Sequence, residues 1–138
     1  MALGLRLPEI RAAIALRRDQ PAQSSELLAS ASPYEGAYLE ANYLRGLAYL
    51  RLKTGAEAAA EFPKIADNKG ANWASHWQHP YGGQVYSLSY LGAARGYALA
   101  GDTGKSRKAF QDFFELWKDA DASQPVLAKA KAEYAELR

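Results

Sequence analysis

Apolar residues along the chain recur at helical spacing, and no segment alternates strictly between apolar and polar positions. Ile10, Ala13 and Ile14 share one side of a first helix, which the sequence predicts to begin at Pro8 because proline favours the first helical turn. A break at 19–21 ends this helix and starts the next one. The pattern predicts an all-α protein of about seven helices without a sheet.

Proline, glycine and capping residues place the other helix ends. Ser32-Pro33 should stop the second helix, and Asp102 or Thr103 should cap the helix that follows the Gly101-Asp102 turn. Pro63 lies inside a predicted helix and is expected to kink it. The third helix is expected from about Gly36 or Tyr38 to Lys53, and the fourth follows a Thr54-Gly55 turn and runs to about Asp67. The later helices are expected from about Gln84 to Ala100, from the 102–103 cap to about Lys118, and from near Pro125.

The helical pattern repeats along the chain. Ala15-Leu16-Arg17 returns 34 positions later as Tyr49-Leu50-Arg51, and a third copy follows 48 positions after the second. Small and aromatic residues recur in register, as Gly46, Tyr49, Ala58 and Phe62, then Ala94, Tyr97, Ser106 and Phe110, with a weaker first copy at Ala12, Ala15, Ser24 and Leu28. The extra 14 positions indicate an insertion at 68–83, where Asn, Gly and Pro accumulate.

A 34-residue period made of two helices resembles the tetratricopeptide repeat (TPR). The resemblance implies a single domain over 1–138: a TPR-type helical-hairpin solenoid with repeats at about 8–32, 38–67 and 84–119. It also implies that Phe62, Tyr97 and Phe110 are buried between helix pairs. Residues 124–138 should form a capping helix, because Leu127, Ala130, Tyr134 and Leu137 make one apolar stripe.

The C-terminal stretch resembles a narrower group. The segments at 97–103, 110–113, 116–121 and 130–134 are similar to the C-terminal TPR region of large bacterial serine/threonine protein kinases of the acidobacterial type. This resemblance implies a module of a larger signalling protein, bacterial in origin. The cytoplasm is the expected location, with an extracytoplasmic one as the alternative if the parent is a membrane-spanning kinase.

Composition argues against a disulfide-rich, a nucleic-acid-binding or a membrane-spanning protein. A chain of 138 residues with no cysteine builds one core and has no disulfide framework. The net charge of +2 and the interspersed signs argue against nucleic acid as a partner. No apolar run reaches the roughly 18 residues that a transmembrane helix needs, so no membrane insertion is expected.

Three features invite an enzymatic interpretation, and each has a simpler one. Residues 101–106 resemble a phosphate-binding loop, but Leu99 stands where the motif needs glycine, so a helix–helix turn is expected. His76 and His79 are too few ligands for a metal site. Asp112 and Glu115 suit a solvated helix face. No kinase motif is present. We therefore expect no enzyme activity, cofactor or metal in this segment.

The TPR resemblance implies that the first helix of each pair lines a concave groove where a protein or peptide partner docks. By repeat position the groove residues are Arg17, Tyr43, Leu44, Leu47, Arg51, Leu88, Leu91 and Arg95. Glu9, Ala13, Leu44, Leu88 and Gly92 occupy the positions of the family's carboxylate clamp, so such a clamp is not expected. Leu44 and Leu91 have an equal alternative as core between repeats.

The insertion carries aromatic residues, Trp73, Trp77 and Tyr81, which either pack against the array, the favoured interpretation, or contact a partner. Together these features predict a non-catalytic interaction scaffold that docks a peptide, a partner domain or another domain of its parent chain. The groove, apolar with a few basic residues, suits an amphipathic helix. The alternative is a structural element that forms a homodimer.

Overall fold

The computed structural model describes residues 2–29, 39–67, 82–120 and 123–137. These residues form helices and no strand, so the all-α prediction is confirmed for the described part of the chain. The helices are α1 (Ala2–Arg17), α2 (Pro21–Leu28), α3 (Leu39–Arg51), α4 (Gly55–Asp67), α6 (Gly82–Leu99), α7 (Thr103–Leu116) and α8 (Pro125–Glu136).

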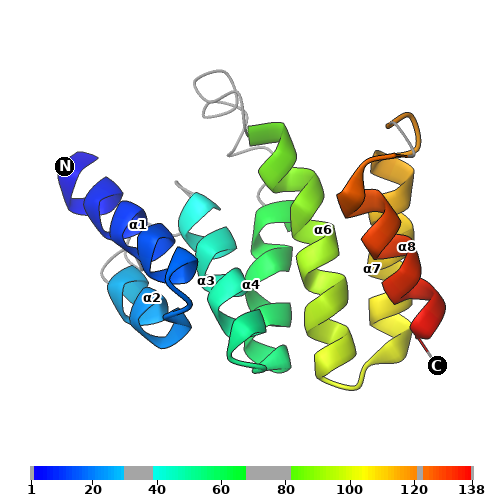
Figure 1. Cartoon of the computed structure of the whole chain (residues 1–138), viewed down its shortest axis with the longest axis horizontal. Coiled ribbons are helices and arrows are strands. Elements are labelled where there is room, and N and C mark those ends of the chain that lie inside the picture. Colours follow the sequence, from blue (N-terminus) through cyan, green and yellow to red (C-terminus); the bar gives the residue numbers. More distant parts are fainter. Residues whose placement is uncertain (1, 30–38, 68–81, 121–122, 138) are drawn as a thin grey trace.

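The helices stand in a row, with the N-terminus at one end and α8 at the other (Figure 1). Three antiparallel pairs, α1–α2, α3–α4 and α6–α7, follow one another, and we call them the first, second and third hairpins. Each hairpin turns within three residues, at 18–20, 52–54 and 100–102. Such short turns force the two helices of a hairpin to lie side by side.

The three hairpin turns have the same geometry. Asp19, Lys53 and Gly101 occupy equivalent places with φ of 56°, 61° and 84°. The residue after each donates its N–H five positions back: Gln20 to Ala15 at 2.8 Å, Thr54 to Tyr49 at 3.0 Å and Asp102 to Tyr97 at 2.9 Å. This bond closes the C-terminus of a helix around a left-handed residue. The sequence intervals of 34 and 48 therefore correspond to a repeated backbone turn.

The hairpins also share one contact between their helices. The buried Ser24 hydroxyl donates to the Ala12 carbonyl at 3.0 Å, and the buried Ser106 hydroxyl donates to the Ala94 carbonyl at 2.7 Å. In the second hairpin the position equivalent to Ser24 and Ser106 is occupied by Ala58, which is fully buried. A small side chain is required here because the two helices cross closely, and a buried hydroxyl must find an acceptor.

The main core lies between the second and third hairpins and is centred on Phe62. Its fully buried ring lies against glycines of both neighbouring helices: a Cβ on Gly46 of α3 or on Gly92 of α6 would come within 2.6 Å or 2.5 Å of ring atoms. Phe110 is 1% exposed, so the predicted burial of both phenylalanines is confirmed. Tyr97 differs, since it is only half-buried, at the edge of this core.

Helix α8 begins at Pro125 as predicted. Leu127 and Ala130 are buried, and the Tyr134 ring meets Phe110 and Phe114 edge-on, with centroids 5.9 Å and 5.6 Å apart. The predicted apolar stripe therefore packs on the third hairpin.

Helix α1 begins at Ala2, six residues before the predicted start, and Pro8 lies inside it. Proline lacks an N–H, so the Gly4 carbonyl loses its helical partner there. Leucine, alanine and arginine precede Pro8 and are strong helix formers, which favours continuation across the proline. Pro63 lies inside α4 as predicted.

Candidate partner-binding site

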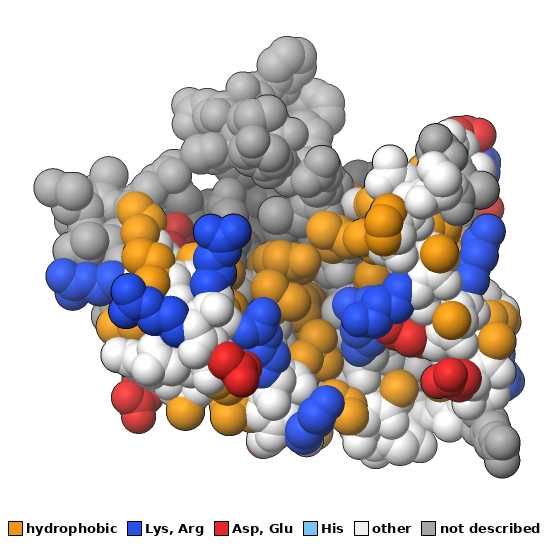
Figure 2. Space-filling model, in the orientation of Figure 1, with side chains coloured by type: hydrophobic (Ala, Val, Ile, Leu, Met, Phe, Trp, Pro, Cys, Tyr) orange, Lys and Arg blue, Asp and Glu red, His pale blue; other side chains and the backbone are white. Residues whose placement is uncertain are grey.

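Two adjoining cavities, of about 350 Å³ and 690 Å³, open on the face made by α3, α6 and α8. They share Leu47, Leu50, Arg95 and Lys129. We call them together the α3–α6–α8 groove. Figure 2 shows hydrophobic side chains along the middle of this face, with Lys and Arg on either side. The surface is hollowed and apolar at its centre, as protein-docking surfaces are.

The apolar lining comes from helical stripes. Tyr43, Leu47 and Leu50 of α3 are spaced by four and three residues and so lie on one side of that helix. Leu88 and Leu91 repeat the spacing on α6, and Val126 of α8 completes the opposite wall. Leu50 and Leu88 are half-buried, while Val126 is 37% exposed. The fold therefore leaves these apolar side chains partly uncovered.

Tyr43 links the groove to the core. Its ring meets Phe62 edge-on, with centroids 5.8 Å apart. Burial raises the pKa of the Tyr43 hydroxyl, and the nearby Arg95 charge opposes that effect in part. The hydroxyl therefore stays protonated at neutral pH and is available as a hydrogen-bonding group, not as a base.

Two of the groove's basic residues already have partners. Arg95 on α6 makes two hydrogen bonds to Glu133 on α8, Nε to Oε2 at 2.9 Å and Nη2 to Oε1 at 3.1 Å. This paired geometry fixes α8 against α6. Arg51 donates to the Leu16 carbonyl at the end of α1, and its Nη1 lies 3.9 Å from the exposed carboxylate of Asp19.

Six of the eight predicted groove residues line the groove: Tyr43, Leu47, Arg51, Leu88, Leu91 and Arg95. Two do not. Leu44 packs against the small cluster of Ala12, Leu28 and Ala41 between the first two hairpins, and Arg17 is exposed at the end of α1. Leu91 is only 2% exposed and serves mainly as core. Trp73, Trp77 and Tyr81 lie outside the described residues.

Sequence reasoning missed the contribution of α8 to the groove. Pro125, Val126, Lys129 and Glu133 line it, but the pattern of α8 indicated only a cap with a solvated outer face. The interaction that brings α8 to the groove is the ion pair between Arg95 and Glu133. Glu133 lies 38 residues from Arg95, and nothing in the local pattern of either helix links them.

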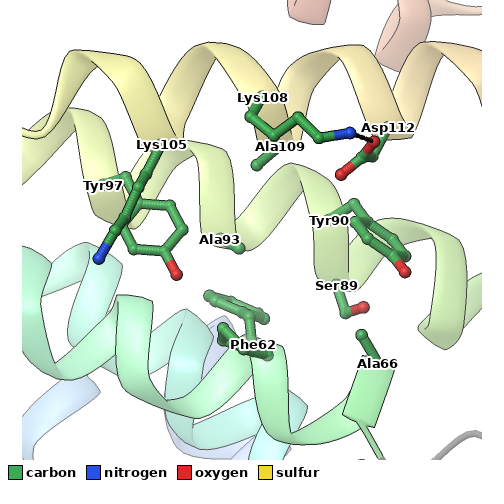
Figure 3. A pocket seen from close by; sticks show the side chains of 11 residues that line it. Phe62, Ala66, Ser89, Tyr90, Ala93, Tyr97, Lys105, Lys108, Ala109 and Asp112 are labelled. Carbon is green, nitrogen blue, oxygen red and sulfur yellow. Dashed lines mark hydrogen bonds and ion pairs between the residues drawn. The ribbon is translucent and has the colours of Figure 1, made fainter.

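A third cavity, of about 220 Å³, lies among α4, α6 and α7 (Figure 3). Its charged groups are already engaged. Lys108 contacts Asp112 at 2.6 Å, and the Lys105 ammonium lies 5.8 Å from the centre of the Tyr97 ring. A hydrogen bond with Tyr86 raises the pKa of Tyr90 to about 12, with burial contributing. The Tyr90 hydroxyl therefore stays protonated at neutral pH in this small recess.

One of the sequence motifs that suggested a phosphate or metal site is the turn at 101–106. Asp102 caps α7, because its Oδ1 accepts from the Lys105 N–H at 3.1 Å, which confirms the predicted cap. Within the described ranges, no three His, Cys, Asp or Glu side chains gather in a way that could hold a metal ion. His76 and His79 lie outside those ranges. Among the described helices, none has the length and apolar character needed to cross a bilayer.

A buried ionic cluster joins the first two hairpins away from the groove. Glu61 on α4 accepts from Asn42 at 3.0 Å and pairs with Arg45 at 3.4 Å, and Arg45 also donates to the Leu28 carbonyl at 3.1 Å. Each charged group here has its counterpart within hydrogen-bond distance. Through the bond from Arg45 to the Leu28 carbonyl, the cluster links the first hairpin to the second.

The groove thus combines two adjoining cavities with apolar side chains that the fold leaves partly uncovered. Comparison of the chain with protein-family models, with curated proteins and with solved structures finds no match.

Proposed function

We propose that this chain is a non-catalytic interaction scaffold of TPR type, which docks a helical peptide or a partner domain in the α3–α6–α8 groove. The repeated turn geometry at Asp19, Lys53 and Gly101 supports the TPR assignment, as do the matching serine hydrogen bonds of the first and third hairpins. Both recur at the intervals found in the sequence.

The observation that carries the docking proposal is the groove itself. Three helices present half-covered apolar side chains around adjoining cavities of about 350 Å³ and 690 Å³. An amphipathic helix, about 10 Å across, buries its apolar stripe in a groove of this kind. The Phe62 core and the Arg95–Glu133 pair hold the groove walls in place. Binding a partner would therefore cost little free energy for ordering the walls.

The parent protein is a second part of the proposal. The C-terminal segments similar to bacterial serine/threonine kinases support a signalling protein whose catalytic domain lies elsewhere. Another domain of that parent is then a natural occupant of the groove.

Self-association is the second candidate function, and one observation favours it. Ile10 and Ile14 of α1 are 55% and 44% exposed and lie four residues apart on one stripe. An exposed apolar stripe of this kind can pair with a second copy. Sedimentation equilibrium over a wide concentration range tests it: a dimer that Ile14→Asp dissociates supports self-association, and a monomer throughout excludes it.

The docking proposal is tested with a display library of random peptides of about 16 residues, long enough for four helical turns. Selected peptides are measured against Leu99→Asp and Val126→Asp, which place a carboxylate in the groove on side chains 46% and 37% exposed. The matched control is Leu116→Asp, 47% exposed on α7 and absent from the groove lining.

We expect both groove variants to weaken the binding of the selected peptides by about tenfold or more, because each puts a charge where an apolar side chain of the peptide would pack. The Leu116→Asp control should bind as the wild type does. Circular dichroism melting confirms that all three variants remain folded. The proposal fails if no peptide is enriched, or if the enriched peptides ignore Leu99→Asp and Val126→Asp.

A further inference from the structure

The net charge of the molecule is concentrated at the groove. The whole chain has 17 basic and 15 acidic residues, which gives +2. The residues that line the groove include four basic ones, Arg51, Lys53, Arg95 and Lys129, and two acidic ones, Glu133 and Glu136. The rest of the chain thus has 13 of each sign and is neutral. The positive charge that a partner meets lies around the apolar hollow.

Pairing within the groove does not remove this charge. Arg95 and Glu133 neutralise each other through their two hydrogen bonds. Arg51 has the exposed Asp19 carboxylate 3.9 Å away, outside the groove lining. Lys53 and Lys129 then face the single carboxylate of Glu136. Both Lys53 and Lys129 are exposed, and within the part of the chain that the structure describes neither makes an ion pair. Two unneutralised ammonium groups therefore border an apolar surface.

The remaining cations lie on both sides of the hollow. Arg51 and Lys53 stand at the C-terminal end of α3, and Lys129 is on α8. Figure 2 shows Lys and Arg side chains on both flanks of the apolar strip. A helix lying in the strip would bury its apolar stripe and turn its flanks toward these cations. Carboxylates on those flanks would be attracted from both walls.

A single terminal carboxylate fits this arrangement poorly. Its clamp needs cations and amides deep in the groove, where this chain has Leu88 and Gly92. The cations here stand at the edges instead. Charge spread along a helical partner matches them, whereas one charge at a chain end does not.

Building on the proposed docking function, we propose that the occupant of the α3–α6–α8 groove is an acidic amphipathic helix, with an apolar stripe and Glu or Asp on its flanks. The apolar stripe supplies most of the affinity, and the carboxylates select the partner and speed its approach. Exposed ion pairs are individually weak and are screened by salt. Selection must therefore come from several such pairs and be strongest in dilute buffer.

Two designed peptides of about 18 residues test the proposal. They share leucines at helical spacing and differ only in the flanks, which are Glu in one and Lys in the other. Fluorescence anisotropy measures both against the full chain. We expect the Glu peptide to bind about tenfold or more tightly in about 50 mM salt, and the preference to shrink in about 500 mM salt.

Reversing the charge of the two exposed groove lysines tests whether these residues cause the preference for the Glu peptide. Lys53→Glu together with Lys129→Glu should abolish the preference or invert it. The matched control is Arg107→Glu with Lys131→Glu, which changes the net charge equally at exposed positions outside the groove lining. The control should keep the preference of the wild type.

The outcomes separate this proposal from the docking function on which it rests. Equal affinity for the two peptides, or a preference for the Lys peptide, overturns the acidic partner while leaving the groove as a docking site. A preference that both double variants abolish equally reflects net charge alone and also overturns it. Failure of both peptides to bind overturns it too, because the random library judges the groove without any assumption about charge.

Discussion

At the scale of single residues, the packing around Phe62 explains why glycine occurs inside two helices. Glycine usually destabilises a helix interior relative to alanine, by about 1 kcal/mol. Here the ring takes the space that a Cβ would need on Gly46 and on Gly92. The second and third hairpins approach each other through this ring, so steric fit outweighs helix propensity at both positions.

We predict that Gly92→Ala destabilises the protein by about 1–2 kcal/mol, since overpacking exceeds the gain in helix propensity. Gly104→Ala is the matched control. Gly104 lies in the first turn of α7, where a Cβ meets only Asp102 Oδ1 at 3.9 Å, so alanine should stabilise by about 0.5 kcal/mol. Urea unfolding measures both. Opposite signs support the fit around Phe62, and two stabilised variants would contradict it.

Tyr90 gives a prediction about pH. Its pKa is raised to about 12, first by the hydrogen bond with Tyr86 and then by burial. The folded state thus keeps the proton where the unfolded state, with a pKa near 10, loses it. The stabilising contribution of Tyr90 is complete below about pH 10 and is lost as pH rises toward 12.

Spectrophotometric titration of the wild type and of Tyr90→Phe isolates the ionisation of this tyrosine by difference. In a Tyr86→Phe background the titration should move toward the ordinary range, because the hydrogen bond is gone. A Tyr90 that titrates near 10 in the wild type would show that the pair does not form.

At the scale of elements, α8 serves both as a cap and as a groove wall. Its inner side, with Leu127, Ala130 and Tyr134, covers the aromatic surface of α7. Its other residues reach the groove, where Glu133 holds Arg95. The same short helix therefore covers the core and shapes the α3–α6–α8 groove.

Ending the chain after Ser123 should expose Phe110 and Phe114, which Tyr134 covers in the full protein. We expect lower thermal stability and concentration-dependent aggregation, as happens when a helical array loses its cap. Light scattering and differential scanning calorimetry measure the two effects. Glu133→Gln is the milder comparison, since it loosens α8 without removing the apolar cover. A truncated chain that melts and behaves like the full one would refute the capping role.

At the scale of the whole molecule, the two hydrophobic clusters are unequal. The larger one joins the second and third hairpins and α8 around Phe62, Phe110 and Phe113. The smaller one holds the first hairpin through Ala12, Leu28 and Ala41. Arg45, which pairs with Glu61 inside the second hairpin, also donates to the Leu28 carbonyl and so links the first two hairpins. Stability in a stacked array is shared between neighbours, so the hairpin with the smaller interface should open first.

We predict that amides of α1 and α2 exchange with deuterium about tenfold or more faster than those of α4 and α6. Arg45→Ala should widen this difference, because it removes the bond to Leu28 and the buried partner of Glu61, which keeps only the part-exposed Lys64. Exchange followed by mass spectrometry resolves the segments. Uniform protection across all hairpins would show that the molecule unfolds as one unit.

Sequence alone determined the helical class, the turn positions and the burial of Phe62 and Phe110. These features follow from local chemistry: apolar spacing sets a helix face, and the intervals of 34 and 48 place equivalent residues in equivalent turns. The start of α1 was missed because proline usually marks the first helical turn, whereas Pro8 lies inside a helix whose earlier residues include several helix formers.

Only the tertiary structure decided which apolar residues stay uncovered. Leu44 and Leu47 are neighbours on one helix, yet the first packs between hairpins and the second lines the groove. Periodicity identifies an apolar face but not what covers it, because that depends on helices distant in the sequence. The same holds for Arg95, whose charge is neutralised by a glutamate on α8. Exposure and charge pairing are properties of packed helices, and no single helix encodes them.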